Sequence, residues 1–202
     1  MGLRLNPSSP SVRRLATSFV ASLATVTLLS TTLISGDASL AGATSGAPRC
    51  TTGDLVVWLN TTGNGAAGSS YYNLEFTNVS AHACSVSGYP GVSAVNVAGT
   101  QIGSAAGHNA EHPATLITLS SATAGGGLGG FVTHNTATVI LQITDAGNYS
   151  NSTCGRVVSA GLRVYPPDQT ASRIIPYPFV TCAKHGPLIL HVEPIQKGVV
   201  TG

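Results

Sequence analysis

Two histidines and a glutamate stand close together in the middle of the chain, at His108, Glu111 and His112. Imidazole and carboxylate groups are suitable ligands for zinc or copper, so these three residues are the weak candidates for a metal site. A spacing of four brings two histidines together only on a helix, and the neighbouring Gly107 and Pro113 disfavour a helix. We predict no metal site and no cofactor, and a metal-binding secreted protein remains an alternative.

Hydrolytic chemistry would need a serine nucleophile on a strained turn, a histidine base and an acid that orients the base. The chain has no Gly-x-Ser-x-Gly elbow, and its acids show no paired arrangement of the glycosidase kind. Because catalytic triads are assembled in space, an exported hydrolase that uses loop Ser and His residues stays an alternative, with His108, His112 or His134 as its base. We predict that the protein is not an enzyme, and we assign no catalytic or ligand-binding residue.

Glycines with the spacing of a dinucleotide-binding loop occur twice in the sequence. That motif works only where a strand precedes it and a helix follows it. Both copies are followed by strand-like sequence, so we predict turns or flexible loops that use the conformational freedom of glycine. The two copies are Gly63, Gly65 and Gly68, and Gly125, Gly127 and Gly130.

Aromatic side chains offer another kind of contact, because a tyrosine has an apolar ring and a polar hydroxyl. Such residues either contact a sugar or a peptide or brace turns, and several have proline neighbours in this sequence. The five tyrosines considered are Tyr71, Tyr89, Tyr149, Tyr165 and Tyr177.

Four cysteines follow the N-terminal region, at Cys50, Cys84, Cys154 and Cys182. An even number of cysteines in an exported chain indicates disulfides, and their wide spacing does not suit a structural zinc site. Four cysteines permit three pairings. Our prediction is local pairing, Cys50 with Cys84 and Cys154 with Cys182, which closes loops of about 34 and 28 residues and stabilises the fold by about 3.5 to 4 kcal/mol per bridge.

The N-terminal region has the features of a secretory signal peptide. Basic residues precede an uncharged stretch from Leu15 to Ile34, and small residues follow at Ala41-Gly42-Ala43. We predict a signal peptide over residues 1–43 and a single domain over residues 44–202, located outside the cell or in the cell envelope. A retained membrane anchor is the alternative, because twenty uncharged residues could just span a bilayer.

Charged side chains are scarce. The sequence has 9 Lys and Arg and 7 Asp and Glu, or 8% of its residues, where a soluble protein has about 25%. Residues 1–43 contain three of the basic residues and one of the acidic residues, so the remaining chain has six of each and is formally neutral. Without a basic patch that could neutralise several phosphates, a nucleic-acid partner is excluded.

Period-two alternation of apolar and polar residues predicts strands throughout the remaining chain. Turn-forming sequences separate them, such as the cluster Thr62-Gly63-Asn64-Gly65. Eight or nine short strands predict an all-β fold, an immunoglobulin-like antiparallel β-sandwich with two disulfides. The predicted strands lie within 54–60, 72–77, 83–86, 92–97, 115–119, 138–143, 162–165, 174–180 and 188–193.

Several of these segments also carry a family resemblance. The order of Cys50, Gly65-Ala66-Ala67-Gly68-Ser69, Cys84, Gly88-Tyr89-Pro90-Gly91 and the late Pro166-Pro167 resembles the family called domain of unknown function 4232. The resemblance runs from about Cys50 to Pro194. It implies a disulfide-bonded β domain exported by an actinobacterium, often as an envelope protein, and it implies no reaction.

Taken together, these features predict a secreted, non-catalytic domain that binds or decorates the cell envelope. Loops at one end of a sandwich are the usual recognition surface of such folds. The sequence does not name the partner, which could be an envelope glycan, a lipid or a protein.

Overall fold

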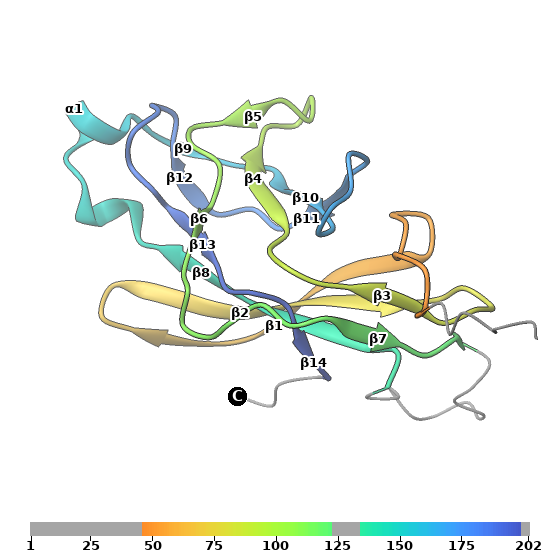
Figure 1. Ribbon diagram of the computed structural model, residues 1–202. Coiled ribbons are helices and arrows are strands. Elements are labelled where there is room, and N and C mark those ends of the chain that lie inside the picture. The colour runs from red at the N-terminus through yellow and green to blue at the C-terminus, as the bar shows by residue number, and fades with distance from the viewer. Residues whose placement is uncertain (1–45, 123–133, 199–202) are drawn as a thin grey trace, which may run out of the picture. The chain divides into compact units, whose positions relative to one another are not determined.

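The computed structural model describes residues 46–122 and 134–198, which consist mainly of β-strands (Figure 1). The described residues include fourteen strands and two short helical segments, η2 (Ala146–Asn148) and α1 (Asn151–Cys154). No helix within these ranges is long and apolar enough to cross a membrane. The predicted signal peptide over residues 1–43 and the glycines at 125, 127 and 130 lie outside the described residues.

The largest sheet runs across the lower part of Figure 1, with β1, β2 and β8 as its long strands. Neighbouring strands pair antiparallel, except for the parallel pair of β13 and β6. Strand β14 (Gln196–Lys197) pairs with β8 beyond the end of β13. The strands in sheet order are β1 (Leu55–Ala66), β2 (Ser69–Asn78), β8 (Thr136–Thr144), β13 (Leu190–Val192) and β6 (Gly107–His108).

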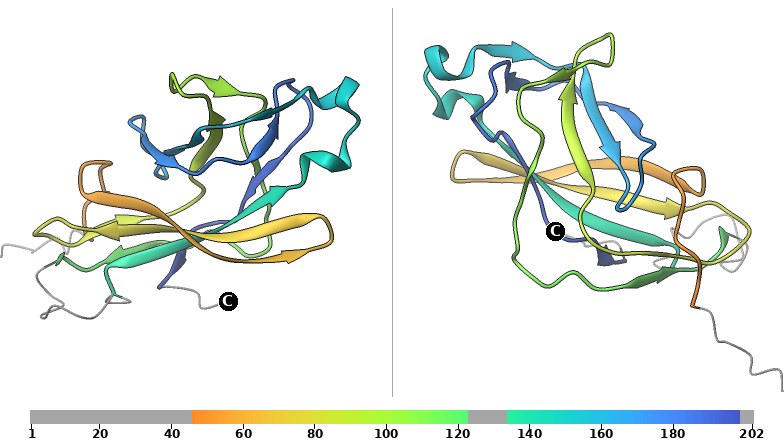
Figure 2. Two further views of the ribbon diagram at one scale, coloured as in Figure 1. Left: turned by 180° about the vertical axis from the view of Figure 1, so that it is seen from behind. Right: turned by 45° about the horizontal axis from the view of Figure 1, so that its top comes forward.

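A four-stranded antiparallel sheet lies above the largest sheet in the two views of Figure 2. Its order is β11 (Arg173–Pro176), β10 (Gly161–Tyr165), β4 (Gly91–Val95) and β5 (Gln101–Ile102). Two antiparallel ribbons accompany the sheets. They are β12 (Val180–Cys182) with β9 (Arg156–Val158), and β3 (Cys84–Val86) with β7 (Ile117–Leu119).

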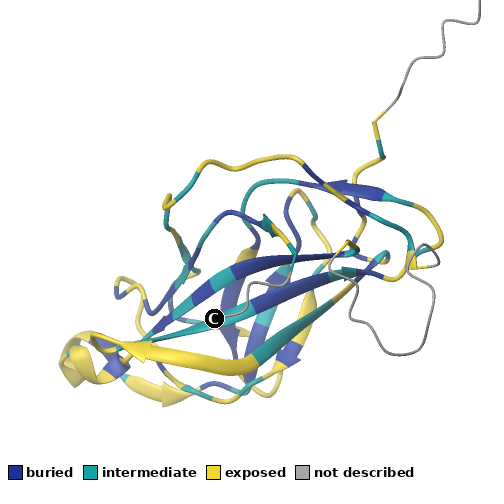
Figure 3. Ribbon diagram, turned by 90° about the horizontal axis from the view of Figure 1, so that it is seen from below, coloured by how far each residue is buried: buried dark blue, intermediate teal, exposed yellow. Residues whose placement is uncertain are grey.

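One hydrophobic core joins these sheets. Leu74 and Phe76 of β2 belong to the same buried cluster as Leu141 of β8 and Leu162 and Val164 of β10. Figure 3 shows buried residues along the middle of the large sheet and exposed residues toward the hairpin end of β1. The prediction of an all-β chain with several antiparallel strands is confirmed.

Two sequence predictions about strand boundaries are wrong. The cluster Thr62–Gly65 is part of β1, which continues to Ala66. The segment 174–180 is not one strand, because β11 ends at Pro176 and β12 begins at Val180 in another sheet. Prolines at 176 and 178 lack the N–H donor that a central strand needs, so the chain leaves one ladder there and enters the next.

Both predicted disulfides are confirmed, Cys50 with Cys84 and Cys154 with Cys182. The first ties the segment before β1 to β3, and the second ties the end of α1 to the end of β12. All four cysteines are buried. Backbone hydrogen bonds accompany each bridge, from the Cys50 amide to the Ser85 carbonyl at 2.9 Å and from the Lys184 amide to the Cys154 carbonyl at 3.1 Å.

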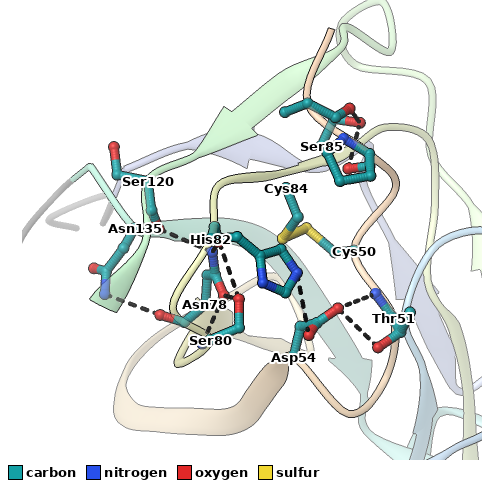
Figure 4. Close-up of a disulfide and its surroundings, with 12 residues drawn as sticks. Cys50, Thr51, Asp54, Asn78, Ser80, His82, Cys84, Ser85, Ser120 and Asn135 are labelled. Atoms are coloured by element: carbon teal, nitrogen blue, oxygen red, sulfur yellow. Dashed lines mark hydrogen bonds and ion pairs between the residues drawn. A yellow bond between two sulfur atoms is a disulfide. The ribbon is translucent and has the colours of Figure 1, made fainter. Parts of the chain in front are cut away.

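Polar groups surround the Cys50–Cys84 bridge (Figure 4). Asp54 Oδ2 accepts hydrogen bonds from the backbone amide and the hydroxyl of Thr51, both at 2.8 Å. These bonds lower the pKa of Asp54, and His82, whose Nε2 lies 3.8 Å from Asp54 Oδ1, acts in the same direction. The buried Asn78 side chain donates to the carbonyls of His82 and Ser120 at 2.9 Å each. The turn before Cys84 is thereby held in place.

Glu75 departs from the predicted alternation, because this glutamate on the polar face of β2 is fully buried. Its Oε2 lies 2.5 Å from Thr138 Oγ1, and its Oε1 has no hydrogen-bond partner among the described residues. Burial raises the pKa of Glu75, while its hydrogen bond with Thr138 lowers it to a smaller extent. Thr138 Oγ1 also lies 2.5 Å from the Gly198 carbonyl oxygen, which can only accept a hydrogen bond. When Glu75 is neutral, its carboxyl can donate to Thr138, and the Thr138 hydroxyl can donate to Gly198.

We predict that Glu75→Gln stabilises the protein increasingly as pH rises from 4 to 8. The pKa of Glu75 is higher in the folded state than in the unfolded state. Its contribution to stability is therefore complete at pH values below the unfolded-state pKa and is lost as pH rises through the folded-state pKa. Glutamine stays neutral and keeps the hydrogen bond to Thr138. Urea unfolding of both proteins across this pH range measures the difference. Asp168→Asn, a change of an exposed carboxyl, is the control, and a pH-independent difference for Glu75→Gln would contradict the prediction.

Candidate functional site

A hollow of about 460 Å³ lies beside the tip of the β1–β2 hairpin. We call it the aromatic hollow, because Tyr72, Tyr177 and Phe179 form part of its lining. Three segments far apart in sequence meet there: the hairpin tip, the end of β8, and the link from β11 to β12. Its lining residues are Gly65, Ala66, Ala67, Gly68, Ser69, Ser70, Tyr72, Ile143, Thr144, Asp145, Tyr177, Phe179 and Val180.

The hairpin tip is a two-residue turn of Ala67 and Gly68. Ala66 pairs with Ser69 across it, and both central residues have positive φ, 49° at Ala67 and 77° at Gly68. Positive φ at both central positions is the requirement of a type I′ turn, whose twist suits the flanking strands. The spacing of Gly63, Gly65 and Gly68 therefore belongs to a hairpin and not to a strand–helix phosphate loop.

A bulge in β1 makes room for the Tyr72 ring. The register between β1 and β2 shifts between Asn60 and Asn64, so that the residues between them lie opposite Tyr72. Asn60 Oδ1 accepts the Thr62 amide at 3.0 Å and stabilises the bulge. A Cβ at Gly63 would lie 2.5 Å from the Tyr72 ring and 2.7 Å from the Tyr71 carbonyl oxygen. Only glycine fits at this position while the ring keeps its place.

The hairpin tip is fixed to the segment that follows β8. The Gly68 carbonyl accepts the Asp145 amide at 2.8 Å and the Asn148 side-chain amide at 3.1 Å. Asp145 in turn caps η2, since its Oδ1 accepts the Gly147 amide at 2.7 Å. These contacts hold lining residues of the hairpin tip and of the end of β8 together.

The aromatic wall consists of three half-buried rings. Tyr72 and Tyr177 meet edge to face, with ring centroids 5.4 Å apart and planes at 66°. Phe179 lies beside Tyr177, with centroids 6.2 Å apart and planes at 31°. Burial, followed by the hydrogen bond with Tyr72, raises the pKa of Tyr177 to about 12, so this phenol is uncharged at physiological pH.

The predicted metal candidates are placed apart from the aromatic hollow. The His108 ring stacks on Tyr89, with centroids 4.1 Å apart. His112 Nε2 lies 3.6 Å from Glu193 Oε2 and 2.5 Å from the Gln196 side-chain nitrogen. Burial raises the pKa of Glu193, the nearby charge of Glu111 adds to this, and His112 opposes it. Across residues 46–122 and 134–198, no group of three or more His, Cys, Asp or Glu side chains could hold a metal ion.

The residues considered for hydrolysis make other contacts. The backbone carbonyl of His134 accepts the Ser120 amide at 3.0 Å. The pair of Asp54 and His82 has a serine nearby, but Ser80 Oγ donates to Asn78 Oδ1 at 2.8 Å or to the His82 carbonyl at 3.0 Å. That hydroxyl is directed at an amide and at the backbone, which is not the geometry of a nucleophile and its base.

Sequence reasoning included Tyr177 among possible contact residues but missed the rest of the hollow. Tyr72 alternates with Leu74 and Phe76 in the predicted strand 72–77, but unlike those two buried residues it is half-buried and lines the hollow. Phe179 and Asp145 gave no distinct signal. The pattern Tyr177-Pro178-Phe179 could have found part of the wall, because residues two apart in an extended chain present side chains to the same side.

The fold and this hollow define a disulfide-bonded, all-β domain of the kind found in oxidising, extracellular surroundings. The family described as "Domain of unknown function (DUF4232)" matches residues 50–193, and the chain belongs to this family. Comparison with curated proteins and with solved structures gives no match.

We predict that Gly63→Ala destabilises the protein by about 1 to 3 kcal/mol, because the new methyl group collides with the Tyr72 ring and with backbone. Gly65→Ala is the matched control in the same strand. A Cβ there meets only the Ser69 carbonyl oxygen, at 3.8 Å, so the control keeps its stability or gains up to about 1 kcal/mol. Urea unfolding measures both, and equal stabilities of the two variants would refute the packing argument.

Proposed function

We propose that the protein is an exported, non-catalytic binding module of the cell envelope and that the aromatic hollow is its binding surface. The observation that carries the proposal is the concave wall formed by Tyr72, Tyr177 and Phe179 next to a polar hairpin tip. Ligand sites are typically concave, of about 300 to 1,000 Å³, with aromatic side chains and a few polar groups. A volume of about 460 Å³ is within that range.

Export by a signal peptide over residues 1–43 belongs to the same proposal. It is supported by the buried disulfides at Cys50–Cys84 and Cys154–Cys182, which persist in oxidising compartments. The near-neutral charge after residue 43 fits a partner recognised by contact and hydrogen bonding more than by long-range attraction. The non-catalytic role is supported by the contacts of His108 and His112, which face Tyr89 and Glu193.

An immunoglobulin-like sandwich is the finer fold assignment that we propose. Two sheets sharing one buried cluster support it. The parallel pairing of β13 with β6 departs from an all-antiparallel arrangement. The disulfides differ from the inter-sheet bridge of an immunoglobulin domain, because each joins a cysteine outside any strand to one in a two-stranded ribbon.

Co-sedimentation with insoluble bacterial cell envelopes tests the function. We predict that the purified chain sediments with envelopes well above its level without them. Tyr177→Ala should lose most of this binding because it removes the centre of the aromatic wall. Tyr71→Ala is the matched control, since Tyr71 is the neighbour of Tyr72 in β2 and points to the other face of the sheet. If the same amount of protein sediments with and without envelopes, the proposed function is wrong.

A further inference from the structure

We infer that the aromatic hollow takes one neutral sugar residue of an envelope polysaccharide, stacked on Tyr177 and Phe179. This inference rests on the proposed binding function and adds the chemical class of the ligand. A pyranose has an apolar face of C–H groups and an edge of hydroxyl groups. Its site therefore needs an aromatic surface and a nearby set of hydrogen-bond acceptors and donors, and the hollow offers both.

The aromatic wall suits a flat ligand. Tyr177 and Phe179 are two residues apart in the link between β11 and β12, and their tilted rings have centroids 6.2 Å apart and planes at 31°. This arrangement is a shallow platform on which C–H groups can contact the electron-rich ring faces. Tyr72, which also lines the hollow, supports Tyr177 through an edge-to-face contact.

Polar groups also line the hollow. Ser70, two residues before Tyr72 in β2 and on the same face of the sheet, brings a hydroxyl that can both donate and accept. Asp145 brings a carboxylate whose Oδ1 accepts the Gly147 amide and whose second oxygen can accept from a ligand. Sugar hydroxyls are donors that a carboxylate binds well, since hydrogen bonds to an ionised acceptor are stronger than neutral ones.

The charge of the lining selects against other ligands. The residues that line the hollow contain no Lys, Arg or His, so a phosphate or another anion would meet Asp145 without a compensating cation. A quaternary ammonium ion is bound by rings that surround it. Here Tyr72 and Tyr177 are in contact with each other and leave no space between them for a cation.

The hollow is formed before any ligand arrives. The hairpin tip is hydrogen-bonded to Asp145 and Asn148, and the segment after Phe179 leads within three residues to the Cys154–Cys182 bridge. A preformed site loses little conformational entropy when it binds, so even a single sugar residue can be held.

Nuclear magnetic resonance titration of the purified chain tests the inference. The four probes are neutral hexasaccharides: α-linked glucose, β-linked glucose, mannose and N-acetylglucosamine. We expect at least one to give saturable shifts at residues of the hollow. Tyr177→Ala should weaken that binding about tenfold or more, whereas Tyr177→Phe, which keeps the ring and the fold, should stay within about threefold. Asp145→Asn keeps the cap of η2 and should weaken binding by removing the charged acceptor. Tyr71→Ala should bind like the unchanged chain.

Choline and deca-proline serve as competing probes in the same titration. The sugar assignment would be overturned if choline or deca-proline shifts residues of the hollow and no hexasaccharide does. It would also be overturned if the hexasaccharides shift only residues on other surfaces. If no hexasaccharide binds but envelope sedimentation still depends on Tyr177, the ligand class is wrong and the binding function stands. If sedimentation does not depend on envelopes, the proposed function itself is wrong.

Discussion

The Cys154–Cys182 bridge is the constraint on which the candidate site depends. It joins α1 to β12, and the chain next to each of them leads to lining residues of the aromatic hollow. Asp145 and η2 precede α1, while Phe179 and Val180 precede Cys182. Arg156 strengthens the same junction, because its side chain donates to the carbonyls of Ala146 and Tyr149 at 3.2 and 2.9 Å. A chain with short strands and few charges gains order here from a covalent link.

Small residues at the hairpin complement this constraint. Gly63 allows the Tyr72 ring to lie against β1, and Ala67 and Gly68 turn the chain with positive φ. Ala67 is costly in this conformation compared with glycine or asparagine, since a Cβ disfavours the left-handed region by about 1 to 2 kcal/mol. The turn persists because the Gly68 carbonyl accepts hydrogen bonds from the Asp145 amide and from the Asn148 side chain.

Local patterns predicted most of the architecture. Alternation within the segments 72–77 and 138–143 indicated paired strands, because side-chain period is a property of a few neighbouring residues. Of the glycines predicted to form turns, Gly68 does so, together with Ala67. The cluster Thr62–Gly65 lies instead within β1, where Asn64 and Gly65 pair with Tyr71 and Ser70. Burial of Glu75 was also missed, since alternation does not reveal what covers the second face of a sheet.

The hollow itself could not be predicted in this way. It forms where residues near 67, 145 and 179 meet, and their meeting depends on sheet order and on the choice among three cysteine pairings. Tyr177 was recognisable as a contact residue, but its neighbours Tyr72 and Asp145 acquire their role only from the assembled fold.

The most direct test of this account compares the two bridges. Envelope binding is measured for Cys154→Ser/Cys182→Ser and for Cys50→Ser/Cys84→Ser, at a temperature where circular dichroism shows both to be folded. The account predicts that the first variant binds about tenfold more weakly or worse, a loss of about 1.4 kcal/mol, and that the second binds within about twofold of the unchanged chain. Equal binding by the two variants would contradict it.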